Sequence, residues 1–145
     1  MAAPGTTLVI SGSTVRGSVI ANRGGAFSLC GSTVSSKVTV SRAAGFVLVG
    51  DPGDDGCAGN SISGSVTLTS NTGGVEVSNN PLIGGRLKLS HNSGGGPFDD
   101  AAPEVEANVI HGGISCTGNT PAPTNDGQPN TVSGIRSGQC NTPGF

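Results

Sequence analysis

A short phrase recurs along this 145-residue chain and constrains its fold more than any other feature. Its later copies begin with Asn and its earlier copies with Ser. In each copy the third residue is Val, Ile or Leu. The copies start at Ser13, Ser32, Asn60, Asn80, Asn108 and Asn130. They divide one domain, residues 1–145, into repeats 13–31, 32–59, 60–79, 80–107, 108–129 and 130–140. A period of about twenty residues is the signature of a solenoid of stacked units.

Within each repeat, short runs alternate between apolar and polar residues. Val66 and Leu68, for example, fall on one face of an extended chain and Thr67 on the other. Gly is too frequent, at 26 residues, to leave room for a long amphipathic helix. A single repeat cannot bury its apolar face, but stacked repeats can if each strand pairs in parallel with its neighbours. The sequence therefore predicts an all-β fold, a parallel β-helix (β-solenoid) of about five rungs with three short strands each.

Recurrent asparagines predict ladders of stacked amides along the solenoid axis. The main ladder comprises Asn60, Asn80, Asn108 and Asn130. A partial second ladder comprises Asn71, Asn92 and Asn119. Asn also suits turns through its tolerance of left-handed backbone, and we expect both effects to act together, with the recurrence favouring the ladder.

Four cysteines without a CxxC pair indicate two disulfides and an oxidising compartment rather than a zinc site. Cys30 and Cys57 fall near the ends of neighbouring repeats, and Cys116 and Cys140 fall at similar positions of two later ones. Register therefore predicts the disulfides Cys30–Cys57 and Cys116–Cys140. In the chain-entropy model, each would raise the free energy of unfolding by about 3 kcal/mol. The opening residues lack a signal-peptide pattern, and we expect a mature secreted, extracellular protein.

The phrases Asn130-Thr131-Val132-Ser133-Gly134, Val66-Thr67-Leu68 and Asn71-Thr72-Gly73-Gly74 resemble the units of secreted parallel β-helix proteins, particularly small Gly/Asn/Val-rich members from actinobacteria. The resemblance covers residues 13–140. It implies a right-handed, pectate-lyase-like coil. It does not imply an activity, because the same coil occurs in lyases, adhesins, phage spikes and passive fibres.

No residues are predicted to be catalytic. Glu76, Glu104 and Glu106 project outward from neighbouring rungs, and the first two share a register, which would suit an acid/base pair. The preferred interpretation is a solvated face with ordinary surface charges. His91 and His111 fall at different points of their repeats, so we expect both to be exposed turn residues.

The acidic insertion after residue 50 is the best metal candidate. Asp51, Asp54 and Asp55 offer the hard oxygen ligands that calcium prefers, although their spacing does not match an EF-hand. An ordinary polar loop is the favoured alternative, and calcium is the only cofactor that the sequence suggests. Asp99 and Asp100, beside Phe98, form a second acidic tip.

Composition disfavours several partners. Seven Lys and Arg against nine Asp and Glu, with no Trp or Tyr, argue against nucleic acid. No segment approaches the roughly 20 apolar residues of a membrane span. We expect a secreted, non-enzymatic structural or surface-interaction solenoid, with filaments formed by end-to-end stacking of its own copies as one form. Polysaccharide binding or processing is the main alternative, and ice binding through aligned threonines, interrupted at Lys88, a lesser one.

Overall fold

The computed structural model describes residues 4–94 and 102–145, and in these residues it contains strands but no helix. The strands form three sheets, each with parallel pairing throughout. Sheet A contains β3 (Val19–Asn22), β6 (Val38–Ser41), β9 (Val66–Thr69), β12 (Leu87–Ser90), β15 (Ile114–Thr117) and β17 (Arg136–Gly138). Sheet B contains β1 (Leu8–Ser11), β4 (Phe27–Cys30), β7 (Val47–Val49), β10 (Val75–Ser78) and β13 (Glu104–Glu106). Sheet C contains β2 (Thr14–Val15), β5 (Thr33–Val34), β8 (Ser61–Ile62), β11 (Leu82–Ile83), β14 (Val109–Ile110) and β16 (Thr131–Val132).

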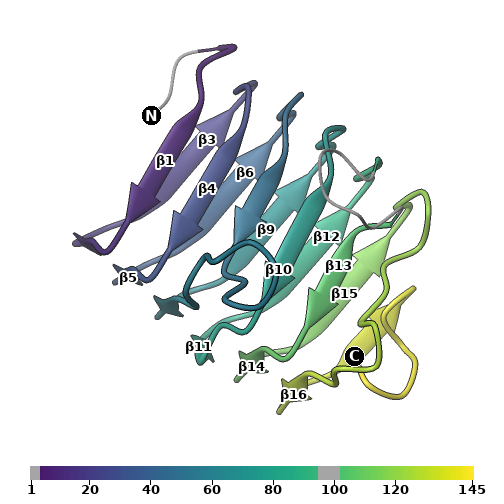
Figure 1. Ribbon diagram of the computed structural model, residues 1–145. Coiled ribbons are helices and arrows are strands. Elements are labelled where there is room, and N and C mark those ends of the chain that lie inside the picture. The colour runs from purple at the N-terminus through teal and green to yellow at the C-terminus, as the bar shows by residue number, and fades with distance from the viewer. Residues whose placement is uncertain (1–3, 95–101) are drawn as a thin grey trace.

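Each full coil passes through sheet C, then sheet A, then sheet B, and each strand pairs with the equivalent strand one coil away. In Figure 1 the chain colour changes steadily from one end of the stack to the other, with sheet B in front of sheet A. The predicted parallel β-helix is confirmed, with five to six rungs of three strands. Its right-handed coiling stays a prediction.

The core is a set of aliphatic columns that run along the solenoid axis. On sheet C, for example, Val34, Ile62, Ile83 and Ile110 stack in successive rungs and are fully buried. Because parallel pairing places like positions above one another, each rung adds the same kind of side chain to the same column. A narrow interior of Val, Ile and Leu therefore suffices without Trp or Tyr.

The main asparagine ladder is present and is buried. Asn60 donates from its backbone N–H and its amide to Oδ1 of Asn80, at 2.9 and 3.0 Å. Asn80 makes the same pair of bonds to Asn108, and Asn108 to Asn130. Each amide also donates to a backbone carbonyl, such as that of Val49 for Asn80. The ladder thus satisfies buried backbone groups at the corner where sheet B ends.

The second ladder is also present and is one member longer than expected. Asn71 donates to Asn92 and Asn92 to Asn119, and Asn119 donates to Oε1 of Gln139. The residue before each of these asparagines has a left-handed backbone, as at Ser70 (φ 56°). The ladder asparagines themselves have no positive φ, so tolerance of left-handed backbone does not explain their recurrence.

Both predicted disulfides, Cys30–Cys57 and Cys116–Cys140, are formed, with sequence separations of 27 and 24 residues. Cys116 and Cys140 lie in the core, near the C-terminal rung. There Phe145, only 6% exposed, packs on the core, and its carbonyl accepts a hydrogen bond from Arg136. Phe145 therefore covers part of the core at the last rung.

Candidate functional site

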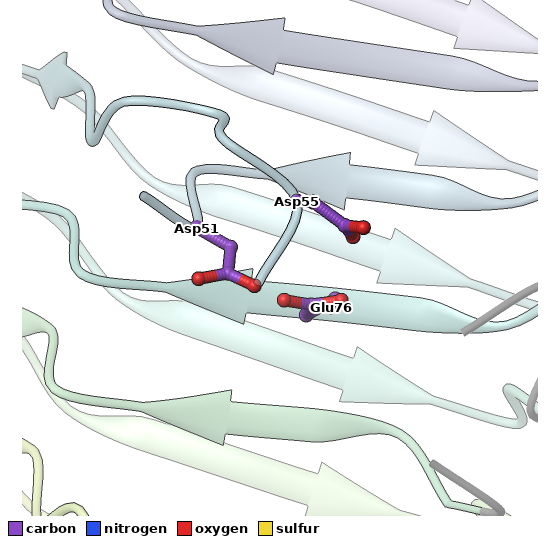
Figure 2. Close-up of side chains that lie close together, drawn as sticks. All are labelled: Asp51, Asp55 and Glu76. Atoms are coloured by element: carbon purple, nitrogen blue, oxygen red, sulfur yellow. The ribbon is translucent and has the colours of Figure 1, made fainter. Parts of the chain in front are cut away.

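Carboxylates gather on the outer side of sheet B, where β7 leads into a loop formed by residues 51–57. This 51–57 loop turns back over the sheet and lies in front of β10 in Figure 1. It is held at both ends, because Asp51 and Cys57 form an antiparallel bridge and Cys57 is joined to Cys30. The loop thereby brings Asp51 and Asp55 to Glu76 of β10, and the carboxylate oxygens of the three residues lie within 4.8 Å of one another. Figure 2 shows the three side chains close together, with the carboxyl groups of Asp51 and Glu76 side by side.

Glu76 holds a proton at neutral pH. Its side chain is 4% exposed. Burial raises its pKa most, and the hydrogen bond to Asp51 and the negative charges of Asp51, Glu104 and Asp55 raise it further, to about 10. The protonated carboxyl group of Glu76 can therefore donate a hydrogen bond to its neighbour.

Asp51 is the ionised partner of this pair. Burial alone would raise its pKa, but hydrogen bonds from Glu76 and from the backbone N–H groups of Gly53, Asp54 and Asp55 bring the pKa below its ordinary value. The amides of Gly53 and Asp54 donate to Oδ1 of Asp51 at 2.9 and 3.3 Å. The two carboxyl groups thus share one proton in a hydrogen-bonded acid–carboxylate pair.

The prediction that the outward glutamates form a solvated face is wrong. Glu76 and Glu104 are paired in register as expected, but Glu76, Glu104 and Glu106 are only 4%, 7% and 4% exposed. The physical reason is coverage by loops that are distant in sequence. The 51–57 loop covers Glu76, and the segment before β16 reaches the last rung of sheet B, where Thr124 bridges to Glu104 and Gln128 donates to Glu106.

The calcium candidates are only partly brought together. The cluster contains Asp51 and Asp55 but Glu76 in place of Asp54, which is exposed on the loop. Calcium binding stays a prediction. The second acidic tip, Asp99 and Asp100 beside Phe98, lies outside the described residues. His91 and His111 are exposed in different turns, as expected.

The outer face of sheet A has a different character. Parallel register aligns its outward side chains in two columns, and most of them carry hydroxyl groups. The first column is Ile20, Thr39, Thr67, Lys88, Ser115 and Ser137. The second column is Asn22, Ser41, Thr69, Ser90 and Thr117. Lys88 interrupts the hydroxyl groups at the predicted place and is exposed.

Some of these polar side chains bond to one another across rungs. The Ser41 hydroxyl donates to Oδ1 of Asn22, and the hydroxyls of Thr69 and Ser90 are 3.1 Å apart. Neighbouring rungs of a sheet lie about 4.8 Å apart, and alternate residues on one strand about 6.6 Å apart. Hydroxyl groups therefore recur at regular spacing along the face and form a hydroxyl lattice, in which Ser90 is buried and the threonines of β6 and β9 are half-buried.

Comparison of the chain with protein-family models, with curated proteins and with solved structures finds no match. Within the described ranges, no helix has the length and apolar character needed to cross a membrane. Functional interpretation therefore depends on the two faces themselves, the buried carboxyl groups over sheet B and the hydroxyl lattice of sheet A.

Proposed function

We propose that the protein is a secreted, non-enzymatic surface-interaction module that contacts extended polysaccharide chains through the outer face of sheet A. The observation that carries this proposal is the in-register hydroxyl lattice on that face. Side-chain hydroxyls both donate and accept hydrogen bonds, as sugar hydroxyls do, so the lattice can exchange hydrogen bonds with an extended glycan over several rungs. Two disulfides are compatible with an extracellular location.

Burial of the carboxyl groups over sheet B is the reason for ranking binding above catalysis. Asp51 and Glu76 are each 4% exposed, so a substrate cannot reach them in this conformation. They are also hydrogen-bonded to each other, whereas glycoside hydrolysis uses two carboxyl groups at least about 5 Å apart with the sugar between them.

Binding to insoluble polysaccharides in a sedimentation assay tests the proposal. The informative variant replaces Thr39 and Thr67 with Val, which removes two neighbouring hydroxyls of the lattice and keeps the side-chain shape. The matched control replaces Thr14 and Thr33 with Val, since these exposed residues are neighbours on sheet C. We expect the first pair to weaken binding and the control pair to leave it unchanged. Equal loss in both, or no binding by the wild type, would contradict the proposal.

Polysaccharide processing is a second candidate, favoured by the shared proton of Asp51 and Glu76. A catalytic role would require the 51–57 loop to move away from β10. Release of reducing sugars or unsaturated products by the wild type, lost in Glu76→Gln, would establish it. Thermal hysteresis in the freezing of protein solutions would instead indicate ice binding by the same hydroxyl lattice.

Filament formation is not part of this proposal. A second copy stacked on the C-terminal rung would have to displace Phe145 from the core. Among the described residues, β1, β2 and β3 at one end and β16 and β17 at the other are all edge strands. Each end therefore has strand edges without a strand partner in this part of the chain.

A further inference from the structure

Among the described residues, opposite charges are separated between two sides of the solenoid. The chain has seven Lys and Arg and nine Asp and Glu. Every acidic residue that the structure describes lies on a strand of sheet B or in a segment beside it: Asp51, Asp54, Asp55, Glu76, Glu104, Glu106 and Asp126. Every Lys and Arg lies on a strand of sheet A or in a turn next to one: Arg16, Arg23, Lys37, Arg42, Arg86, Lys88 and Arg136.

Five of these cations surround the hydroxyl lattice, and we call the lattice together with them the cationic face. Lys88 projects from the lattice itself. Lys37 and Arg86 each immediately precede a strand of sheet A, along one margin, and Arg23 and Arg42 each immediately follow one, along the other. All five side chains are exposed.

In the part of the chain that the structure describes, the cationic face has no carboxylate. Within residues 4–94 and 102–145, none of its five cations forms an ion pair, and the guanidinium of Arg42 contacts only Oδ1 of Asn22, at 3.4 Å. The described acidic side chains lie on or beside sheet B, on another side of the solenoid. Among the described residues, a ligand on sheet A therefore meets cations and hydroxyl groups but no carboxylate, although the whole chain has a formal net charge of −2.

We propose that the cationic face binds an anionic polysaccharide, an extended hydroxylated chain with regularly spaced negative charges. This inference rests on the proposed function and adds the charge of the partner. Arg and Lys supply charge-assisted hydrogen bonds to anionic groups, and the lattice between them supplies bonds to sugar hydroxyls.

Two other polyanions fit the face less well. Single-stranded nucleic acid is bound through aromatic side chains that stack on bases, and the sequence has no Trp or Tyr. A membrane surface is bound by burying apolar side chains. Among the described residues, the large exposed apolar side chains on or beside this face are Ile20, on the first strand of sheet A, and Ile135, immediately before the last strand, too far apart to form one patch.

Three polymers with one backbone provide the test: neutral dextran, carboxymethyl dextran and dextran sulfate. Each is immobilised and binding of the intact protein is measured at low and physiological salt. We expect carboxymethyl dextran and dextran sulfate to bind at least about 10-fold more tightly than dextran, with weaker binding at higher salt. Their relative affinities then show whether carboxylate or sulfate is the better ligand.

Matched arginine variants locate the binding. Arg86→Ala and Arg16→Ala each remove one exposed Arg from a turn that joins sheet C to sheet A, but only Arg86 borders the cationic face. We expect Arg86→Ala to weaken binding to carboxymethyl dextran about 3-fold, and Arg86→Ala with Lys88→Ala about 10-fold. Arg16→Ala should bind as the wild type does. Thermal unfolding of each variant confirms that the fold is retained.

The outcomes separate this inference from the proposed function. Equal affinity for all three dextrans would overturn the inference and leave polysaccharide contact through sheet A standing. Equal weakening by Arg16→Ala and Arg86→Ala would also overturn it. Binding would then depend on the net charge of the protein and not on the position of Arg86 beside sheet A. Absence of binding to the dextrans and to the insoluble polysaccharides would overturn both.

Discussion

Replacing Asn80 with Ala interrupts the main asparagine ladder at a fully buried position. The Asn80 side chain accepts bonds from the N–H and the amide of Asn60, and it donates to the carbonyl of Val49 and to Oδ1 of Asn108, both at 2.8 Å. The substitution removes these four bonds. It leaves the buried N–H of Asn60 without this partner.

The expected loss follows from those contacts. A typical intramolecular hydrogen bond contributes about 1 kcal/mol net, and a buried donor left without a partner costs about 1–3 kcal/mol. Some groups keep a second partner, since the amide of Asn60 also donates to the carbonyl of Leu29. We therefore expect Asn80→Ala to lower the free energy of unfolding by about 4 kcal/mol. For a domain of nearly this size, that corresponds to a fall in melting temperature of about 12 °C.

Urea unfolding followed by far-UV circular dichroism measures this change. The control is Asn22→Ala, because Asn22 is an exposed Asn at the end of β3 that accepts a bond from Ser41. We expect the control to change the free energy of unfolding by less than about 0.5 kcal/mol. If Asn80→Ala cost less than about 1 kcal/mol, the ladder would not stabilise the stack, and the recurrence of Asn would need another explanation.

Three further changes test other parts of the fold. Replacing Cys116 and Cys140 with Ala should destabilise the protein by about 3 kcal/mol in urea unfolding, and unchanged stability would contradict a role for this crosslink. The folded protein keeps the Glu76 proton up to about pH 10, whereas the unfolded chain releases it near 4.5. The Glu76 contribution to stability is therefore complete below pH 4.5 and is lost as pH rises toward 10, by up to about 1.4 kcal/mol per unit. Glu76→Gln should flatten this slope, and an unchanged pH profile would refute the assignment. Ala107→Gly should raise stability by about 1 kcal/mol because Ala107 has a left-handed backbone (φ 49°), and a loss would show that its methyl group matters more.

Register explains how much of the fold could be predicted. Because like positions stack, spacing in the sequence was enough to pair Cys30 with Cys57 and to assign Asn80 and Asn108 to one ladder. Gln139 extends the second ladder, but the recurrence of Asn does not indicate it because it is a different residue type. Its position, twenty residues after Asn119, was the available signal.

The carboxyl cluster could not be predicted in the same way. The spacing of the repeats shows that Glu76 points outward, but it does not show what covers the outside of a rung. That depends on the path of the 51–57 loop, which is an insertion and follows no repeat. Asp51 therefore meets Glu76 through loop geometry, and the same loop changes the expected exposed charge into a buried proton donor. By contrast, the separation of acidic and basic residues follows from the sequence once each charged residue is assigned to a sheet.

Amide chemical shifts during a titration with carboxymethyl dextran test the central claim most directly, because they report which side of the solenoid contacts the glycan. We predict shifts in β6, β9 and β12 and in the turns that carry Arg42 and Arg86, with β10 and the 51–57 loop unaffected. Shifts concentrated on β10 and that loop would contradict binding through sheet A and would direct attention to the buried carboxyl pair.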